Sequence, residues 1–453
     1  MATEVSVLDK YGETTYYSNY ADARMDIINS EIEHPLVQIW ADLDEQIILL
    51  DEADIWIAPG VTIRNSSTTI IAPTTGNLNC KIYGYGTIKN TSTGNCIYIS
   101  NGNAKLSIEC DLIEGTGGSG SVSVNIQVAN EFQLTCNKVS NRDNQAIRIG
   151  ELSIPGLILY FNLKIIYLET GNDSSTFTGT TAITSRGNGF IEIEKIICKN
   201  RGHCLSHREG NVLASIKKSQ STNNISGDAG AAIHIRQYDF FNPGIGVQKL
   251  ILYFDEIDSL KGSINSTAGV EVGEGTGVFI GRKIYSKNSP AIQIQGDITK
   301  GYIKCNEVIS QGNNDEFPVN AVELSNFTNQ IIVDANFIIG YRDSGVVFTN
   351  GSANFILKNA KIINTFTSSS ESSVGIFIFG GNQNIALSNV EIITGDLTNG
   401  RTIYFANTND INLKNYGLFV NKEIDTNIKL LIGIENTSDP DYNYLYIVDP
   451  ILT

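Results

Sequence analysis

The fold follows from one block of sequence, which recurs as IIVDANFI (331–338), FILKNAKI (355–362), IALSNVEI (385–392) and INLKNYGL (411–418). In each copy apolar residues alternate with other residues, an Asn or Asp step interrupts the alternation, and further apolar residues follow. Thirteen copies lie along the chain, and the first is KIYGYGTI at 81–88. The 330 residues from first to last copy contain 12 steps, so the mean period is about 27.5 residues.

A second short block lies between these copies and reads small, apolar, any residue, apolar. Examples are CIYI (96–99), AIHI (232–235), AIQI (291–294) and TIYF (402–405). Strict alternation of this kind is typical of a strand with one buried face. The two blocks interleave once per period, with Gly, Asn and Ser turns and no helix between them. We therefore predict an all-β fold, a single-stranded right-handed parallel β-helix of about 12 to 13 rungs over residues 79–420.

An Asn or Asp recurs at the bend within the first block, for example at Asn306, Asn336, Asn359 and Asn389. Asn tolerates a left-handed backbone, and amides stacked on successive rungs can hydrogen bond along the axis. We therefore assign these residues a structural role.

Where the spacing between copies is long, extra residues should loop out of the coil. The candidate loops are 168–180, 238–248 and 366–374. Because loops on a rigid scaffold often carry binding residues, these segments are candidate binding loops.

The two ends of the chain depart from the repeat. Residues 20–33 (YADARMDIINSEIE) carry an amphipathic helix pattern, with Met25, Ile28 and Ile32 on one side. We predict that 1–78 form an N-terminal cap containing this short helix, because a solenoid must cover its open sheet edges. Residues 421–453 lose the repeat and predict an irregular C-terminal cap or an oligomerisation segment.

A short helix followed by IILLDEADIWIAPGVTI (47–63), where APG separates two apolar strands, resembles the N-terminal entry of pectate-lyase-like right-handed parallel β-helix proteins. That group includes phage tailspikes and fibres, and the resemblance covers the whole chain as architecture. Glycan-cleaving members use clustered carboxylates, sometimes with calcium and an Arg or Lys base, and polygalacturonases carry NTD, DD, GHG and RIK signatures. This chain has GHC at 202–204 in place of GHG, with no RIK and no NTD–DD series. The resemblance therefore supports the fold better than the activity.

The balance of charge excludes some partners. The net charge is -16, so the surface repels the phosphates of nucleic acid and disfavours an anionic membrane. No stretch is long and apolar enough to predict membrane insertion. The opening residues MATEVSVLDKYGETT carry no signal-peptide pattern, so we expect assembly in a host cytoplasm.

The seven cysteines do not predict a metal site. Cys96, Cys110, Cys136 and Cys305 sit in apolar strand patterns, which indicates buried thiols. The pair Cys198 and Cys204 flanks His203, but zinc there would lack further ligands. We predict no metal and no cofactor.

Weak candidates for catalysis are Glu271, Glu323 and His234, which occupy the outward position of the second block. The two glutamates lie two rungs apart, hence roughly 10 Å, at or just beyond the upper limit for an inverting glycosidase pair. Because exposed acids are common in so acidic a chain, we lean against an enzyme, and a glycan depolymerase is the alternative.

Three arginines share a register in successive copies, Arg186, Arg208 and Arg236 in AITSR, CLSHR and AIHIR, with His234 beside the last. One interpretation is an internal ion network neutralised by nearby acids such as Glu209. The other is an anion-binding face, because the planar fork of arginine suits carboxylate and phosphate.

Outward aromatic residues occupy late rungs, namely Phe377, Phe379 and Tyr404. Exposed aromatic patches indicate a glycan platform or a subunit contact. Contact between subunits is the favoured interpretation, because these rungs lie near an end that must be covered.

Our leading hypothesis is a structural, receptor-binding virion protein of the fibre or tailspike kind. It would assemble with itself as a homotrimer and with other virion proteins, and would contact host-cell glycan. The alternative is a polysaccharide-degrading enzyme, a hydrolase or lyase mounted on a virion. Release of reducing ends or unsaturated uronides from host polysaccharide separates the two.

Overall fold

A computed structural model gives the structure of the chain. It describes residues 4–65, 68–73, 76–116, 121–150, 159–171, 181–199, 202–222, 231–235, 248–260, 268–273, 275–287, 289–295, 298–311, 320–325, 329–340, 347–364, 374–394, 401–406, 410–415, 418–420 and 432–435. The chain divides into two compact units, unit 1 (1–216 and 238–246) and unit 2 (217–237 and 247–453). The division falls within strand β19 (Leu205–Ser221).

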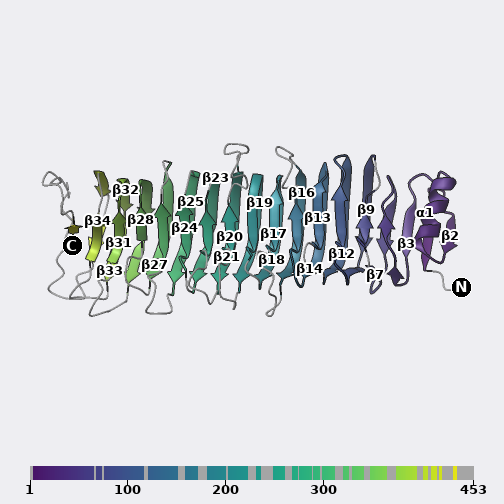
Figure 1. The fold of residues 1–453 in the computed structure, drawn as a ribbon, viewed down its shortest axis with the longest axis horizontal. Helices are drawn as coiled ribbons and strands as arrows, with labels where there is room; N and C mark the ends of the chain where they lie inside the picture. The colour runs from purple at the N-terminus through teal and green to yellow at the C-terminus, as the bar shows by residue number, and fades with distance from the viewer. Residues whose placement is uncertain are drawn as a thin grey trace. The chain divides into compact units, whose positions relative to one another are not determined.

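The fold class predicted from the repeat is confirmed. The chain is nearly all β and forms a parallel β-solenoid of about ten turns, fewer than the predicted 12 to 13, with one helix among the described residues. Figure 1 shows the strands of each unit stacked side by side. Strands form here because apolar side chains, many of them β-branched or aromatic, alternate along the chain and pack inward, while the residues between them face out.

Unit 1 contains two main stacks of parallel strands. The first runs through β3 (Leu36–Ile39), β6 (Asp54–Ile57), β9 (Leu78–Gly84), β12 (Ala104–Gly115), β14 (Glu131–Asn141), β16 (Tyr160–Thr170) and β18 (Asn188–Cys198). The second runs through β5 (Ile47–Ile48), β8 (Ile71–Ala72), β11 (Ile97–Ser100), β13 (Val124–Val128), β15 (Ile147–Ile149), β17 (Ile183–Arg186) and the start of β19. Three short strands stack on the end of β12, namely β4 (Leu43–Asp44), β7 (Thr62–Asn65) and β10 (Thr87–Asn90).

Unit 2 repeats this arrangement. One stack runs through β20 (Ile233–Ile235), β22 (Val270–Val272), β24 (Ile292–Gln295), β26 (Val322–Ser325), β28 (Val347–Asn350), β31 (Val374–Phe379), β34 (Arg401–Ala406) and β37 (Ile432–Glu435). The other runs through β21 (Gln248–Ser259), β23 (Gly275–Ser286), β25 (Ile298–Ser310) and β27 (Ile331–Gly340). It then divides into β29 (Ala353–Lys358), β32 (Asn382–Ser388) and β35 (Asp410–Asn415) and, beside them, β30 (Lys361–Asn364), β33 (Val390–Thr394) and β36 (Leu418–Val420).

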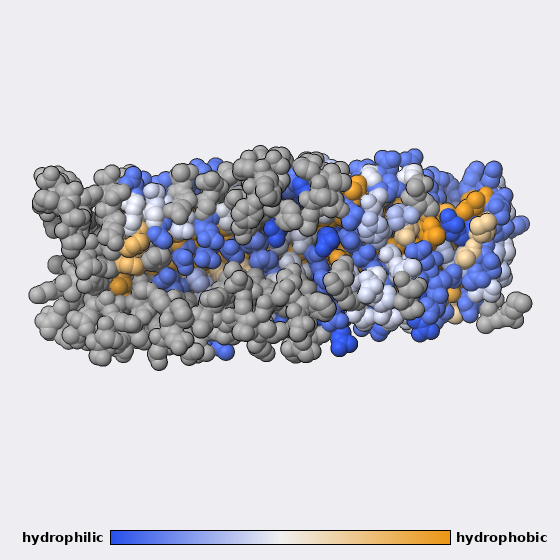
Figure 2. Space-filling view, in the orientation of Figure 1, coloured by the Kyte–Doolittle hydropathy of each residue, from blue (hydrophilic) through white to orange (hydrophobic). Residues whose placement is uncertain are grey.

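The core of each unit is made of apolar side chains stacked on successive rungs. In unit 1, for example, Leu106, Phe132 and Phe161 lie in register on three neighbouring strands, and none is more than 3% exposed. Burial of each such side chain stabilises the fold by about 1.5–3 kcal/mol. The same alternation leaves polar residues outside, and Figure 2 shows a largely hydrophilic described surface with small apolar patches.

The asparagine ladder is confirmed at two pairs of neighbouring rungs. Asn359 and Asn389 adopt left-handed backbone with φ of 51° and 55°. The Asn389 amide donates to Asn359 Oδ1 at 3.1 Å, and Asn336 donates to Asn306 Oδ1 at 3.3 Å. Asn359 and Asn389 therefore turn the chain, and the amide bonds of both pairs link successive rungs.

The N-terminal cap contains the predicted helix, α1 (Tyr20–Asn29), and an antiparallel pair, β1 (Val5–Leu8) and β2 (Thr14–Tyr17). The predicted inner face of the helix is wrong, because Met25 and Ile28 are 51% and 44% exposed, and Ile32 lies beyond the helix. The buried face consists of Tyr20, Ala23 and Ile27.

The reason for this rotation lies at the start of the helix. The Tyr20 hydroxyl donates to Ile48 O at 2.7 Å, and the Glu45 carboxylate accepts from the Tyr20 and Ala21 amides. These bonds fix the Tyr20 face against the entry strands. A pattern of large aliphatic residues alone does not reveal this anchor.

Parallel pairing begins earlier than the predicted residue 79, because β3 already pairs in parallel with β6. It also continues beyond the predicted residue 420, because β37 pairs in parallel with β34. The predicted loops 168–180, 238–248 and 366–374 fall mostly outside the described residues, as does the C-terminal segment 421–453 apart from β37. Within the described part of the chain, no helix has the length and apolar character to cross a membrane.

Candidate functional site

Four polar residues of unit 2 form a column across neighbouring strands, which we call the acidic column: His234, Glu271, Gln293 and Glu323. Cα register pairs His234 with Glu271, Glu271 with Gln293, and Gln293 with Glu323. The two glutamates therefore lie two rungs apart, as predicted. Each alternates along its strand with apolar residues of the core, which directs its side chain to the outer face.

The column is less exposed than the sequence predicted. His234 is 3% exposed and Glu271 is 5% exposed, although both occupy outward positions. Gln293 and Glu323 are half-buried. A buried carboxylate needs hydrogen-bond partners, because desolvation of an ion is costly.

Those partners are amides and an imidazole. Gln295 Nε2 donates to Glu271 Oε1 over 3.4 Å, and His234 Nε2 lies 4.0 Å from the same oxygen. Gln293 Nε2 donates to Glu323 Oε1 over 3.5 Å. Burial raises the pKa of Glu323 above its ordinary value, and the bond from Gln293 offsets this only in part. Gln293 and Glu323, the half-buried members of the column, thus present an amide and a carboxyl group that can bond the hydroxyls of a ligand.

The predicted arginine column does not form, because of a β-bulge. On β17 and β19, Ser185 pairs with His207, but the register then shifts and Arg186 pairs with Glu209. The extra residue, Arg208, is left out of register and is half-buried. The alignment that placed Arg186 and Arg208 at one position is therefore wrong by one residue.

The bulge creates a buried ion pair. The Arg186 guanidinium donates to the Glu209 carboxylate, and the two residues are each 8% exposed. This geometry corresponds to the internal network, in which Glu209 neutralises Arg186. The third arginine of the prediction, Arg236, lies outside the described residues.

A polar pair inside unit 1 was missed by sequence reasoning. His207 and Ser185 are both 0% exposed and point into the core. The His207 Nε2–H donates to Gly210 O at 2.9 Å, so Nδ1 accepts from the Ser185 hydroxyl at 3.0 Å. Burial lowers the pKa of His207 to about 4, which keeps the imidazole neutral. The sequence feature that could have revealed this pair is a histidine at an inward position of CLSH (204–207).

Two of the three late aromatic residues, Phe377 and Phe379, face outward as predicted. Phe377 and Tyr404 pair in register, and the Phe377 and Phe379 rings are 6.3 Å apart between centroids. Phe379 is 37% exposed and Phe377 is half-buried, while the Tyr404 side chain lies outside the described residues.

The alternation in GVVF (345–348) predicts that Val347 faces outward, and this prediction is wrong. Val347 pairs with Val322 and Ile376 and is 1% exposed, so it faces the core. The run GVVF has no polar residue to mark its faces.

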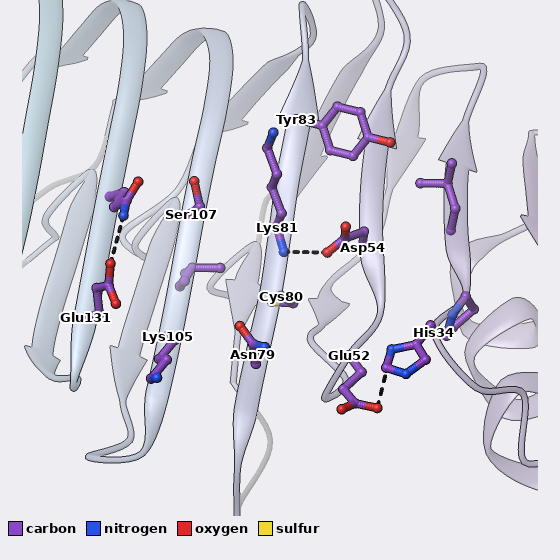
Figure 3. A pocket seen from close by; sticks show the side chains of 14 residues that line it. His34, Glu52, Asp54, Asn79, Cys80, Lys81, Tyr83, Lys105, Ser107 and Glu131 are labelled. Carbon is purple, nitrogen blue, oxygen red and sulfur yellow. Dashed lines mark hydrogen bonds and ion pairs between the residues drawn. The ribbon is translucent and has the colours of Figure 1, made fainter. Parts of the chain in front are cut away.

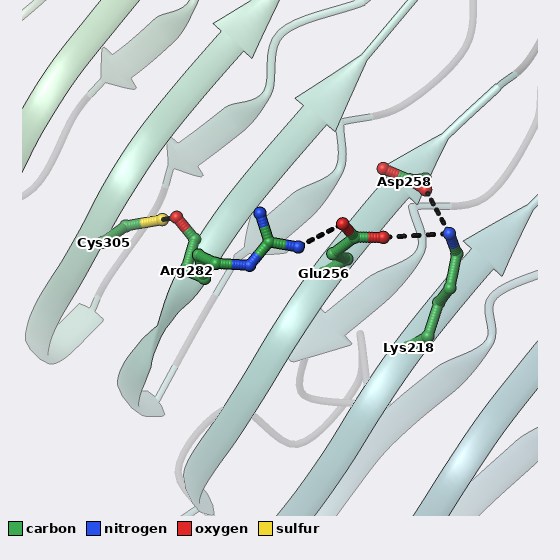
Figure 4. Close-up of polar contacts among 5 residues, drawn as sticks. All are labelled: Lys218, Glu256, Asp258, Arg282 and Cys305. Atoms are coloured by element: carbon green, nitrogen blue, oxygen red, sulfur yellow. Dashed lines mark hydrogen bonds and ion pairs between the residues drawn. The ribbon is translucent and has the colours of Figure 1, made fainter.

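Unit 2 also carries a surface ion network on its other stack (Figure 4). Lys218 Nζ lies 2.9 Å from Glu256 and 3.5 Å from Asp258, and Arg282 donates to the other oxygen of Glu256. The hydrogen bond from Lys218, followed by that from Arg282, lowers the pKa of Glu256. Because each charge has an opposite partner on a neighbouring strand, this network is structural.

Within the described residues, no group of three or more His, Cys, Asp or Glu side chains could hold a metal ion. All seven cysteines are free and buried. Comparison of the chain with protein-family models, with curated proteins and with solved structures found no match.

Proposed function

We propose that this chain is a structural, receptor-binding virion protein of the fibre or tailspike kind, which presents the outer face of its solenoid to glycan on a host surface. The observation that carries the proposal is the acidic column. Its carboxyl and amide groups recur at the rung spacing of about 4.8 Å, on a scaffold whose strands fix their positions. Such groups suit the closely spaced hydroxyls of a sugar chain.

The test is binding to purified host-surface polysaccharide, measured by calorimetry. We expect Gln293→Ala and Glu323→Ala to weaken binding at least about tenfold. The matched control is Glu307→Gln, because Glu307 is also half-buried but lies on β25 in the other stack. Equal affinity of the wild type and the three variants for the polysaccharide contradicts the assignment of the acidic column as the binding site.

A second function, glycan cleavage, is favoured by one observation. Glu271 and Glu323 are carboxyl groups on one face two rungs apart, and burial raises the pKa of Glu323. A raised pKa keeps a carboxyl protonated to higher pH, as a general acid requires, with the other carboxylate then serving as base.

Glu323→Gln separates the two functions, since it removes the proton donor but keeps the size and the hydrogen bonding of the side chain. Cleavage predicts that the wild-type protein releases reducing ends from the polysaccharide and that Glu323→Gln binds without releasing them. If the wild-type protein binds the polysaccharide and releases no reducing ends, the enzymatic function is rejected.

A further inference from the structure

Unit 1 carries a groove of about 560 Å³ on the outer face of its first stack, which we call the N-terminal groove (Figure 3). It crosses strands β3, β6, β9, β12 and β14, so four rung steps give it a length of about 19 Å. Its volume lies within the range of about 300–1,000 Å³ that is usual for ligand sites. No repeat pattern predicted it, because residues from five neighbouring strands make it.

One column along the groove consists of Asp54, Lys81, Ser107 and Gln133, which line it from four neighbouring strands. Asp54 Oδ1 accepts from the Lys81 backbone amide at 2.8 Å, so that carboxylate is held in place by the next rung. Lys81 and Gln133 are exposed, and Ser107 is half-buried. The column therefore offers both donors and acceptors at successive rungs.

A second column beside it consists of Glu52, Asn79, Lys105 and Glu131. Glu52 lies 3.4 Å from His34 Nδ1, and Gln133 donates to Glu131 at 2.8 Å. Acidic, basic and neutral groups alternate, so the groove has no strong excess of one charge. This mixture does not favour a polyanion such as nucleic acid, whose binding requires a surplus of cations.

Aromatic rings lie beside these columns. Trp56 and Tyr83 are in register on β6 and β9, and Trp40 stands edge-on to Trp56 with 4.7 Å between ring centroids. Trp40 is 49% exposed, although its Nε1–H donates to Ser6 Oγ at 3.0 Å and so fixes the ring. Lys81 Nζ lies 4.9 Å from the Tyr83 ring centroid. These rings give the site a rigid apolar face.

From this arrangement we infer that the N-terminal groove is a binding site for an uncharged or weakly charged oligosaccharide, separate from the acidic column of unit 2. The inference rests on the proposed function only in its choice of glycan as ligand class. A sugar ring has one apolar face, which stacks on Trp56 and Tyr83. Its hydroxyls both donate and accept, which matches the alternating groups of the two columns. The length of the groove suits an extended chain of several sugars.

Intrinsic fluorescence can report on this site, because the chain contains two tryptophans and both lie beside the groove. Trp56 pairs in register with Tyr83, which lines the groove, and Trp40 packs against Trp56. Intrinsic fluorescence is followed during titration with cellohexaose, maltohexaose, chitohexaose and fragments of the host polysaccharide. Calorimetry of the same titrations reports binding anywhere on the molecule. We expect at least one oligosaccharide to change the tryptophan emission with a saturable dose response.

The blocking variant is Ser107→Phe, which fills the groove from an outward strand position where an aromatic residue is well tolerated. Its matched control is Asn162→Phe, because Asn162 continues the same column beyond Gln133 but does not line the groove. We expect Ser107→Phe to weaken the fluorescence-detected binding at least about tenfold, while Asn162→Phe and Gln293→Ala leave it unchanged.

Failure of this inference is distinct from failure of the proposed function. The N-terminal site is refuted if calorimetry detects heat of binding without a change in tryptophan fluorescence, or if Ser107→Phe does not alter the binding. Neither result contradicts binding at the acidic column. The N-terminal site is supported if Ser107→Phe abolishes the fluorescence-detected binding and Gln293→Ala leaves it unchanged. This conclusion does not depend on whether the acidic column binds glycan. Absence of both signals with every oligosaccharide overturns the site.

Discussion

At the scale of single residues, the bulge between Ser185 and Arg186 converts a predicted row of like charges into a buried ion pair. Removing one partner leaves an uncompensated charge in the interior. We therefore predict that Glu209→Ala lowers the free energy of unfolding by roughly 3–5 kcal/mol, and that Arg186→Met combined with Glu209→Leu restores much of it. Chemical denaturation of the single and double variants measures this.

The control for this prediction is a surface pair in the same unit. Lys164 and Glu192 lie 3.9 Å apart with side chains 63% and 62% exposed. Because solvent screens such a pair, Glu192→Ala should cost about 1 kcal/mol or less. If Glu209→Ala costs no more than Glu192→Ala, the buried pair is not structural.

The buried His207 makes stability depend on pH. Its pKa is about 4 in the folded protein against an ordinary value of 6.5, so the unfolded chain binds a proton first as the pH falls. Its contribution is therefore fully present above pH 6.5 and is lost between that value and about pH 4. The loss amounts to roughly 3 kcal/mol. We predict that His207→Gln shows a smaller loss of stability than the wild type between pH 7 and pH 5 in urea unfolding. Equal losses would show that other groups carry the pH dependence.

At the scale of strands, the stacked inward positions predict which substitutions the fold cannot accept. Ile292 is 0% exposed and pairs in register with Val270 and Val322. Ile292→Asp buries an unpaired charge and should cost several kcal/mol, on the order of 4 or more. Ile292→Val, which removes one methylene group, should cost about 0.5–1.5 kcal/mol. An Ile292→Asp protein as stable as Ile292→Val would refute the inward assignment.

Strands and their faces were predictable because the alternation repeats in every copy, so each copy checks the others. Prediction failed where a single residue disrupts the alternation of inward and outward positions, or where that alternation cannot be recognised. The bulge at Arg186 shifts the register without changing the sequence pattern, and Val347 lies in a run with no polar residue to mark its faces. The N-terminal groove could not be predicted, because Asp54, Lys81 and Ser107 have no common motif and meet only through stacking.

At the scale of the whole molecule, the two units carry different chemistry on the outer faces of different stacks. Unit 1 has a groove of mixed charge beside two tryptophans, and unit 2 has a column of acids and amides. A solenoid permits this, because the inward residues alone specify each turn and the outward ones are free to vary. One scaffold can therefore present separate sites along a chain with a net charge of -16.

Assembly is the last prediction at this scale. A solenoid ends in strands with unpaired backbone groups, which favour addition of a neighbouring chain unless they are covered. Homo-oligomers close by symmetry, and residues 421–453 carry an aromatic cluster, Tyr442, Tyr444 and Tyr446, that suits contact between copies. We expect the intact protein to have three times the 49.3 kDa mass of one chain in light scattering, and a chain that ends at Val420 to be a monomer. Monomers in both samples would refute the trimer, and trimers in both would place the contacts on the solenoid itself, where Phe377 and Phe379 are the first residues to substitute.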